Sequence, residues 1–241
     1  MKLLAFDTST EVMSIAVAHD EQLWQHTGAG GAQASGTLIP AILALLAQAG
    51  LSLQELDAIV FGRGPGSFTG LRTACSVAQG LAFGASAARV PGSPSAPVKV
   101  LPIDTLLAVA EEARFQHGAT RVLALLDARM DEIYTADYEF ESNQWKSGGG
   151  FELIRPENLE ARPGWVLAGN GFASYDARLP RGMPRLAALP TAAAMLRLAP
   201  SLIAAGGAVP AEQALPRYIR DKVAKTTDER AAERAAAAPA I

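Results

Sequence analysis

The segment Gly62-Arg63-Gly64-Pro65-Gly66-Ser67-Phe68-Thr69-Gly70-Leu71-Arg72 decides how the rest of this chain is interpreted. An apolar run at residues 58–61 precedes it, and a helix-like run begins at Leu71. Glycine permits positive φ and close approach of the backbone, whereas proline fixes a turn. The pattern predicts a strand, a stiff glycine loop and a helix. Such a loop either packs the helix tightly on the strand or presents backbone N–H groups to an anion or a partner.

Two catalytic motifs are excluded for this loop. A phosphate-binding Walker loop requires a lysine directly after its last glycine, whereas Leu71 follows Gly70. A nucleophile elbow requires glycines two positions before and two positions after the serine. Around Ser67 those positions hold Pro65 and Thr69. The loop therefore predicts neither a P-loop nucleotidase nor a serine hydrolase.

The bulk composition is that of a folded protein without covalent cross-links. Hydrophobic residues make up 49% of the 241 residues and charged residues 19%, which suits one large domain or two small lobes. The net charge of -3 argues against strong stand-alone binding of nucleic acid, which depends on clustered lysine and arginine. Cys75 is the single cysteine, so neither an intrachain disulfide nor a cysteine metal cage is available.

The first part of the chain predicts a hairpin followed by alternating helices and strands. Residues 2–6 have the composition of a buried strand, and the strands at residues 12–18 and 22–27 follow a polar turn. We expect further strands at residues 58–61 and 98–102. Helices are expected at residues 35–49, 71–83 and 105–115, and a loop rich in alanine, serine and proline at residues 85–97.

The second part repeats the opening pattern. Residues 121–127 and 132–140 predict two strands around a polar turn that contains aspartate, as at the N-terminus. A strand at residues 165–168 and a helix at residues 191–205 follow. Two lobes of mixed α/β structure are the result. Beyond Thr227 the chain is rich in alanine and predicts a frayed tail.

Five segments stand out as a set: LLAFDTST (residues 3–10), GRGPGSFTGLR (62–72), RVLALLDARMDEIY (121–134), AGNGF (168–172) and LPRYIRDKVA (215–224). Together they resemble the TsaB (YeaZ) family, a bacterial subunit of the machinery that makes threonylcarbamoyladenosine in tRNA. They occur in the order of the family and span nearly the whole chain. The loop at residues 85–97 looks longer than its family counterpart, which is a departure.

The resemblance implies a duplicated, two-lobed fold of the actin, hexokinase and Hsp70 type, which is RNase H-like. We expect a first α/β lobe at residues 1–104 and a second at residues 105–216. Residues 217–241 would form a C-terminal segment whose first part packs back on the first lobe.

A low-affinity nucleotide site is the first candidate site. In actin-like nucleotide proteins, an aspartate and small hydroxyl residues of the first hairpin face the phosphates and their magnesium. The segment Gly169-Asn170-Gly171 is a second, weaker candidate, as a close backbone approach to a nucleoside. The matching residues are Asp7, Thr8, Ser9, Thr10, Gly169 and Gly171. ATP or ADP with Mg²⁺ would bind weakly there or at a partner interface. From the residues alone, an ordinary polar turn is the preferred explanation of residues 7–10, and Gly-x-Gly is common in plain turns.

A metal site of the protein's own is not predicted. The three histidines, His19, His26 and His117, are dispersed along the chain. By resemblance, the catalytic paralogue TsaD carries a histidine pair on the helix that matches residues 103–109, where this chain has none. The acidic cluster of Asp127, Asp131 and Glu132 is interpreted as a solvated turn.

The helix at residues 35–49 predicts a partner interface, because it is apolar almost all round. The alternative is a fully internal helix. In the family, the first two helices bundle with TsaD or with a second TsaB. The expected interface residues are Leu38, Ile42, Leu45, Leu46, Ala74, Ala78 and Ala82. The family often has a His-Thr pair before this helix, whereas Ala34-Ser35 stands here.

The residues and the resemblance together imply a non-catalytic scaffold that dimerises and supports TsaD. TsaD would transfer a threonylcarbamoyl group to the adenosine beside the anticodon, with the ATPase TsaE as third partner and tRNA bound only through the complex. A homodimer is expected in isolation. The longest apolar pattern, residues 38–49, is shorter than the ~20 residues that span a bilayer, so a cytoplasmic protein is expected. The alternatives are an independent ATP-dependent phosphotransferase or ATPase and, third, a homodimer with an unrelated role.

Overall fold

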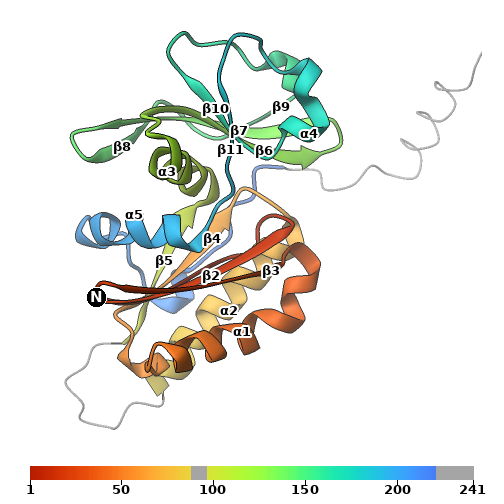
Figure 1. Ribbon diagram of the computed structural model, residues 1–241. Coiled ribbons are helices and arrows are strands. Elements are labelled where there is room, and N and C mark those ends of the chain that lie inside the picture. The colour runs from red at the N-terminus through yellow and green to blue at the C-terminus, as the bar shows by residue number, and fades with distance from the viewer. Residues whose placement is uncertain (88–96, 221–241) are drawn as a thin grey trace, which may run out of the picture.

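The computed structural model describes residues 1–87 and 97–220, which form two lobes with two helices between them (Figure 1). The first lobe contains a five-stranded sheet in the order β3-β2-β1-β4-β5. β1 pairs antiparallel with β2 and parallel with β4. Its strands are β1 (Lys2–Asp7), β2 (Val12–His19), β3 (Gln22–Ala29), β4 (Ala58–Gly64) and β5 (Lys99–Asp104).

The second lobe repeats this strand order. Its main path is β11-β10-β6-β7-β8, in which β6 pairs antiparallel with β7 and parallel with β10, and β9 adds to β7. Its strands are β6 (Arg121–Arg129), β7 (Glu132–Glu141), β8 (Gln144–Ser147), β9 (Glu152–Ile154), β10 (Val166–Gly169) and β11 (Arg185–Ala187). The duplicated actin-like fold is thereby confirmed.

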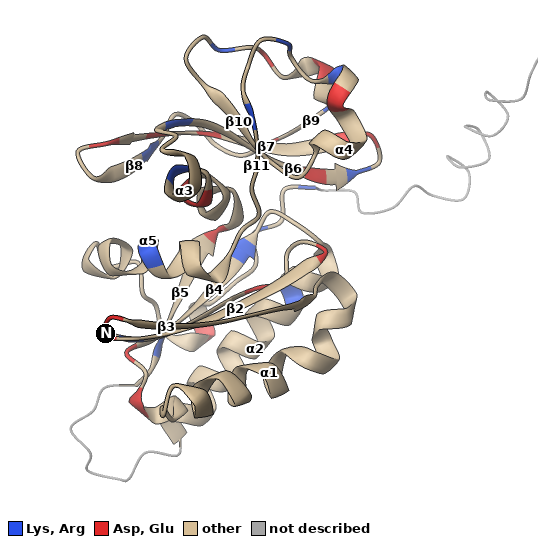
Figure 2. Ribbon diagram, viewed as in Figure 1, with Lys and Arg blue, Asp and Glu red and all other residues tan. Residues whose placement is uncertain are grey.

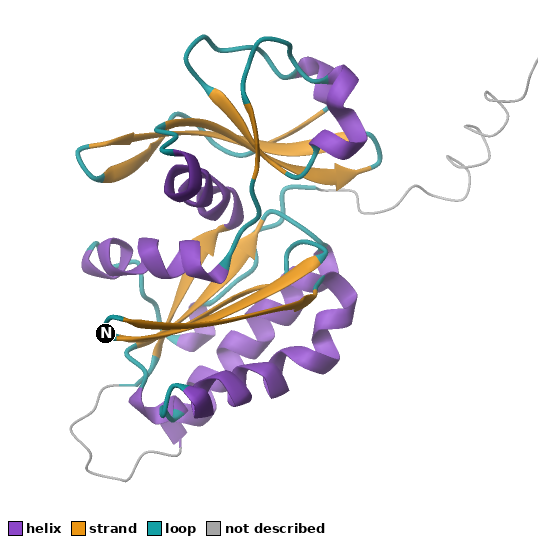
Figure 3. Ribbon diagram, viewed as in Figure 1, coloured by secondary structure: helices purple, strands orange, loops and turns teal. Residues whose placement is uncertain are grey.

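The helices form layers on the sheets (Figure 3). α1 (Ala34–Gln48) and α2 (Phe68–Ala87) cover the outer face of the first sheet. α3 (Thr105–His117) and α5 (Ala192–Ala204) lie between the two sheets, with α5 against β1 and β2 and α3 against β6. A short helix, α4 (Phe172–Tyr175), follows β10.

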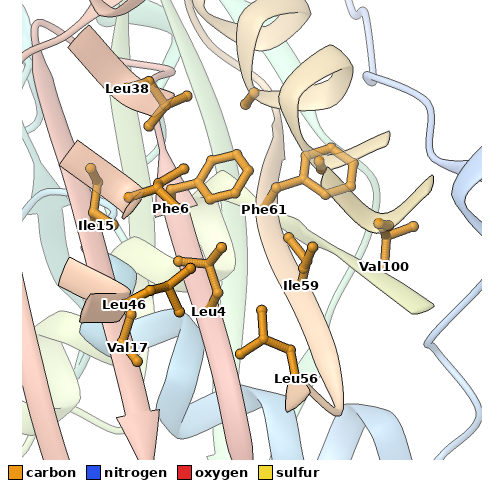
Figure 4. Close-up of a cluster of buried hydrophobic side chains, with 14 of the residues drawn as sticks. Leu4, Phe6, Ile15, Val17, Leu38, Leu46, Leu56, Ile59, Phe61 and Val100 are labelled. Carbon is orange, nitrogen blue, oxygen red and sulfur yellow. The ribbon is translucent and has the colours of Figure 1, made fainter. Parts of the chain in front are cut away.

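Strand alternation decides which side chains meet which layer. Leu4 and Phe6 of β1 join the cluster under α1 and α2 (Figure 4). Leu3 and Ala5 join the cluster under α5. Asp7 follows Leu3 and Ala5 in this alternation, so its side chain lies on the α5 face of the sheet.

A buried ionic network joins α3 to α5 and thus the two lobes. Arg197 Nε donates to Glu111 Oε1 at 3.0 Å, and Arg197 Nη2 donates to Glu112 Oε2 at 2.6 Å. Thr191 Oγ1 also donates to Glu112 Oε2, at 2.7 Å. Both carboxylates are buried and paired with Arg197. Separation of the lobes here would therefore break these ion pairs and leave buried carboxylates without a partner.

The seven residues expected at a partner interface require a correction. Leu38, Ile42, Leu45, Leu46, Ala74, Ala78 and Ala82 are all buried in the first lobe, packed against the sheet (Figure 4). The apolar residues that α1 exposes are instead Ile39 and Leu43. The helix is apolar on both sides, so its composition could not reveal which leucines face the sheet.

Several element boundaries also differ from expectation. α2 begins at Phe68 rather than Leu71 and runs to Ala87, so the first residues of the expected loop are helical. Residues 88–96 of that loop, and the expected frayed tail, lie outside the described residues. The short elements β8, β9, β11 and α4 had no periodic signal. With the preceding turn, α1 forms an 18-residue helical segment (Gly31–Gln48) that is long and apolar enough on average to cross a membrane, by length and composition only. Its buried leucines belong to the core of the first lobe.

Candidate functional site between the lobes

The glycine loop packs on the turn of the first hairpin. Ser67 N donates to the carbonyl of Ser9 at 2.7 Å, and Thr8 Oγ1 donates to the carbonyl of Gly70 at 2.7 Å. A Cβ on Gly66 would lie 2.6 Å from the Ser9 carbonyl oxygen, and one on Gly70 would overlap the Thr8 carbonyl oxygen. The glycines are therefore required for close backbone approach, which is the first of the two roles that the motif allowed.

Asp7 is fully buried beneath the contact between the glycine loop and the hairpin turn. Its Oδ1 accepts hydrogen bonds from Ser9 N at 2.9 Å and Ser9 Oγ at 2.6 Å, whereas the buried Oδ2 has no hydrogen-bond partner among the described residues. Burial raises the pKa of Asp7 to about 7, although the bonds from Ser9 oppose the rise. Because Asp7 is fully buried and its Oδ2 lies against Gly62, the carboxyl group does not reach open space. The expected role of Asp7 toward phosphates or magnesium is corrected accordingly.

A cleft of about 780 Å³ lies between the lobes. The first lobe lines it with hydroxyl-bearing turns, which include Ser9, Thr10 and Ser67. The second lobe lines it with residues 127–130, at the end of β6 and the start of the turn to β7, and with Asn170. Residues 217–220 supply a further wall. Of the six residues expected at a nucleotide site, only Ser9 and Thr10 line the cleft.

The glycine pair of the second lobe is also a packing device. Gly169, at φ +153°, would overlap the Leu125 carbonyl if it carried a Cβ, and a Cβ on Gly171 would lie 2.7 Å from Leu125 Cδ1. Asn170 between them faces the cleft, and its Oδ1 accepts a hydrogen bond from Asp127 N at 2.9 Å. From the sequence, Asn170 was expected only as the middle residue of the Gly169-Asn170-Gly171 turn, with no role for its side chain. Its only signal was a polar residue held between two glycines after a strand.

Charges around the cleft are paired. Arg129 Nη2 forms an ion pair with Glu11, which links the hairpin turns of the two lobes. Asp127 Oδ1 accepts hydrogen bonds from Arg129 N at 2.7 Å and from Tyr175 Oη at 2.9 Å. A ligand here would therefore meet hydroxyl groups and guanidinium groups that already have carboxylate partners.

The acidic turn does not form a metal centre. Asp127 bonds with Tyr175, while Asp131 pairs with Arg178 at 2.7 Å and Glu132 with Arg220 at 2.5 Å. Across residues 1–87 and 97–220, no three His, Cys, Asp or Glu side chains come together as a metal site. The first turn of α3 is core instead, since Leu106 and Val109 are fully buried.

Comparisons with known proteins identify relatives along most of the chain. The family model of TsaD, described as tRNA N6-adenosine threonylcarbamoyltransferase, matches residues 25–232. The tRNA threonylcarbamoyladenosine biosynthesis protein TsaB of Escherichia coli (strain K12) is 34% identical over 93% of this chain and 96% of its own length. TsaB of Haemophilus influenzae is 34% identical over 92% and 95%. The structure of YeaZ from Pseudomonas aeruginosa superimposes with a TM-score of 0.80 and 39% identity, covering 90% of this chain and 99% of that one.

Proposed function

The chain belongs to the TsaB (YeaZ) family, and from this premise we propose that it is a non-catalytic subunit in the biosynthesis of threonylcarbamoyladenosine in tRNA. In this proposal it acts in the cytoplasm, where it binds TsaD, which carries out the transfer with TsaE as third partner. The tRNA is bound only through the complex. The names of the relatives support the role in this modification, and the surface of the first lobe supports the docking.

The outer face of α1 and α2 is the observation that carries the proposal. The two helices together contain a single charged residue, Arg72, and Figure 2 shows them almost free of charge beside the rest of the protein. Solvated helices normally place charged residues on their outer face. Ile39 and Leu43 are 41% and 48% exposed, and Phe83 is 73% exposed. An uncharged surface with protruding apolar side chains is typical of an association site.

The small residues between these side chains favour another helix as the occupant. Gly80 and Gly84 of α2 are exposed, and no atom lies within 4 Å of a Cβ built on either. Ala44 and Ala47 of α1 are exposed too. Small side chains allow the backbone of a partner helix to approach closely. A helical bundle with TsaD, or with a second copy of this chain in isolation, fits such a face.

The start of α3 supports the non-catalytic part of the proposal. In the resemblance, the paralogue TsaD carries its metal-binding histidine pair at this place. Here Leu106 and Val109 fill the core, and Thr105 Oγ1 accepts a hydrogen bond from Gly64 N at 3.1 Å. These residues stabilise the loop beside them and offer no ligand to a metal. We expect the purified protein to transfer no threonylcarbamoyl group without TsaD.

Charge placed on the outer face tests the proposal. Leu43→Glu should leave the circular dichroism unchanged, convert the homodimer to a monomer in light scattering, and reduce co-purification of TsaD at least about tenfold, since burial of one leucine contributes about 1.5–3 kcal/mol. Leu23→Glu is the matched control, because Leu23 is equally exposed, at 47%, and lies on β3. Retention of both the dimer and TsaD binding by Leu43→Glu would contradict the proposal.

Nucleotide binding in the cleft is proposed only at low affinity. Ser9 and Thr10 offer hydroxyl groups, but Arg129 already pairs with Glu11 and Arg220 with Glu132, so neutralising a triphosphate would require breaking ion pairs. Calorimetry with ATP and Mg²⁺ should give a dissociation constant weaker than about 1 µM. Tight binding with turnover by the chain alone would favour the rival function, an independent ATPase or phosphotransferase.

A further inference from the structure

Residues 214–220, called the strap below, lie first along α2 and β4 of the first lobe. Cys75 Sγ and Gln79 Nε2 donate hydrogen bonds to the carbonyl of Ala214 at 3.2 and 2.8 Å. Arg217 N donates to the carbonyl of Arg63 at 2.7 Å. The strap is thus tied by its backbone to a helix and a strand that are both parts of the first lobe.

An aromatic contact extends this attachment to the glycine loop. The rings of Tyr218 and Phe68 are 5.3 Å apart, and Arg72 Nε donates to Tyr218 Oη at 3.1 Å. The Arg72 guanidinium also lies 3.8 Å from the centre of the Phe68 ring. At Gly64 a Cβ would lie 2.7 Å from the Arg217 carbonyl oxygen, so the strap lies directly on the backbone of the loop.

The strap then reaches the second lobe. Ile219 packs against the core cluster of that lobe. Arg220 Nη2 pairs with Glu132 Oε2 at 2.5 Å, and Arg220 Nη1 donates to Met130 Sδ at 3.2 Å. The Arg220 side chain is only 14% exposed, so this ion pair is better shielded from water than most pairs on the protein surface. Within the seven residues of the strap, Ala214, Arg217 and Tyr218 contact the first lobe, and Ile219 and Arg220 contact the second. Figure 1 shows the chain passing between the two lobes here.

We propose that the strap is a latch that limits how far the cleft between the lobes can widen. Residues 217–220 form part of the cleft wall, while the network of Glu111, Glu112 and Arg197 joins the lobes between α3 and α5. With both connections in place, widening of the cleft is limited. A segment held by a few contacts at the end of a fold opens at a lower free energy than the core, so release of the latch is the easy route to a wider cleft. This inference is independent of the partner on α1.

The single cysteine supplies an intrinsic probe of the latch. Cys75 is buried, and burial raises the pKa of its thiol, so it should react slowly with a thiol reagent while Ala214 covers it. A latch couples its two ends. Loss of the contact between the strap and the second lobe should therefore increase the reactivity of Cys75. Loss of the contact with the first lobe should increase hydrogen exchange in the turn after β6.

Both directions are tested in the full-length protein. Arg220→Ala should speed labelling of Cys75 by 5,5′-dithiobis(2-nitrobenzoate) about tenfold. Tyr218→Ala should speed hydrogen exchange of the peptide that covers residues 127–134. Glu132→Ala should reproduce the effect of Arg220→Ala. The control is Arg121→Ala, which removes another Arg–Glu ion pair of β7, that of Arg121 on β6 with Glu139, away from the strap.

The outcomes distinguish a strap that couples the two lobes from one that only packs on the first lobe. If Cys75 labels at the wild-type rate in Arg220→Ala, or if Arg121→Ala accelerates it equally, the strap does not couple the lobes and the proposal is overturned. Tyr218→Phe, which keeps the ring and removes the hydroxyl group, provides a milder variant with an intermediate effect in case Tyr218→Ala does not fold.

Discussion

The two lobes have the same strand order, yet the turns that follow their first strands differ in burial and in charge. In the first lobe, residues 7–10 are buried, bear no positive charge and lie under the glycine loop. In the second lobe, Arg129, Met130 and Asp131 are all exposed, and two of the three, Arg129 and Asp131, are charged. The difference comes from the loop after the fourth strand. The first lobe seals its turn with a tightly packed loop, whereas the second has only the short segment around Asn170.

This comparison shows how one topology provides two kinds of cleft wall. In both lobes an aspartate near the end of the first strand accepts a hydrogen bond from the backbone N–H two residues later. Asp7 accepts from Ser9 N, and Asp127 accepts from Arg129 N. Asp7 is then buried and Asp127 is left half-buried beside Tyr175. Substitutions in the turn after β1 and in the turn after β6 should therefore have different effects.

The largest effect is expected from Gly70→Ala. The new Cβ would overlap the Thr8 carbonyl oxygen, which is backbone and cannot move aside, so we expect a loss of about 4–5 kcal/mol of unfolding free energy or failure to fold. Gly80→Ala on the same helix is the control, since it meets open space and should gain up to about 1 kcal/mol. Chemical denaturation measures both. Equal effects of the two variants would contradict the sealing role of the loop.

The next effect is the pH dependence that Asp7 confers. Its pKa is raised from 3.8 to about 7 in the folded state, so the folded protein binds this proton more tightly than the unfolded chain. Stability is therefore lost as the pH rises between these values, by roughly 4 kcal/mol. Asp7→Asn should abolish this loss and be the more stable protein at pH 8.

Ser9→Ala provides the matched test of the cause. Because the bonds from Ser9 oppose the rise, removal of the hydroxyl group should raise the pKa of Asp7 further and extend the loss to higher pH. Urea unfolding of the three proteins from pH 4 to 8 is the measurement. Identical pH profiles of the wild type and Asp7→Asn would show that Asp7 is not sealed.

A smaller effect is expected in the second lobe from Tyr175→Phe. The variant removes the hydrogen bond from Tyr175 Oη to Asp127 but keeps the buried ring, so a loss of about 1.5 kcal/mol is expected. Thermal unfolding measures it. A loss as large as that of Gly70→Ala would mean that the second turn is as tightly sealed as the first.

The smallest effect is expected from Arg129→Ala, which breaks the ion pair with Glu11 between the two turns. Both side chains are at least 70% exposed, so the loss should be below about 0.5 kcal/mol and should vanish at high salt. Denaturation at low and high ionic strength is the measurement. A loss of several kcal/mol would show that this bridge, rather than the α3–α5 network, joins the lobes.

The periodic elements of the fold could be predicted because strand and helix patterns are local. The repeated hairpins at β1–β2 and β6–β7 and the helices α1, α3 and α5 all lie within a few residues of the expected ranges. The nucleotide-site residues were less predictable. Asp7 and Ser9 are two residues apart, yet one is sealed and the other lines the cleft, because burial depends on what packs from elsewhere.

The sequence by itself determined the family, the two-lobed fold and the need for glycine at the loop of residues 62–70, since these follow from motif order and backbone sterics. Only the tertiary structure decided which face of α1 is core, that Asp7 lies under Gly62 and that Asn170 rather than its flanking glycines reaches the cleft. The physical reason is that these properties belong to contacts between segments more than 50 residues apart or between layers, as in the hydrogen bond of Thr8 with Gly70, 62 residues away. A local pattern specifies an element, but its exposed side is set by the surface that it packs against.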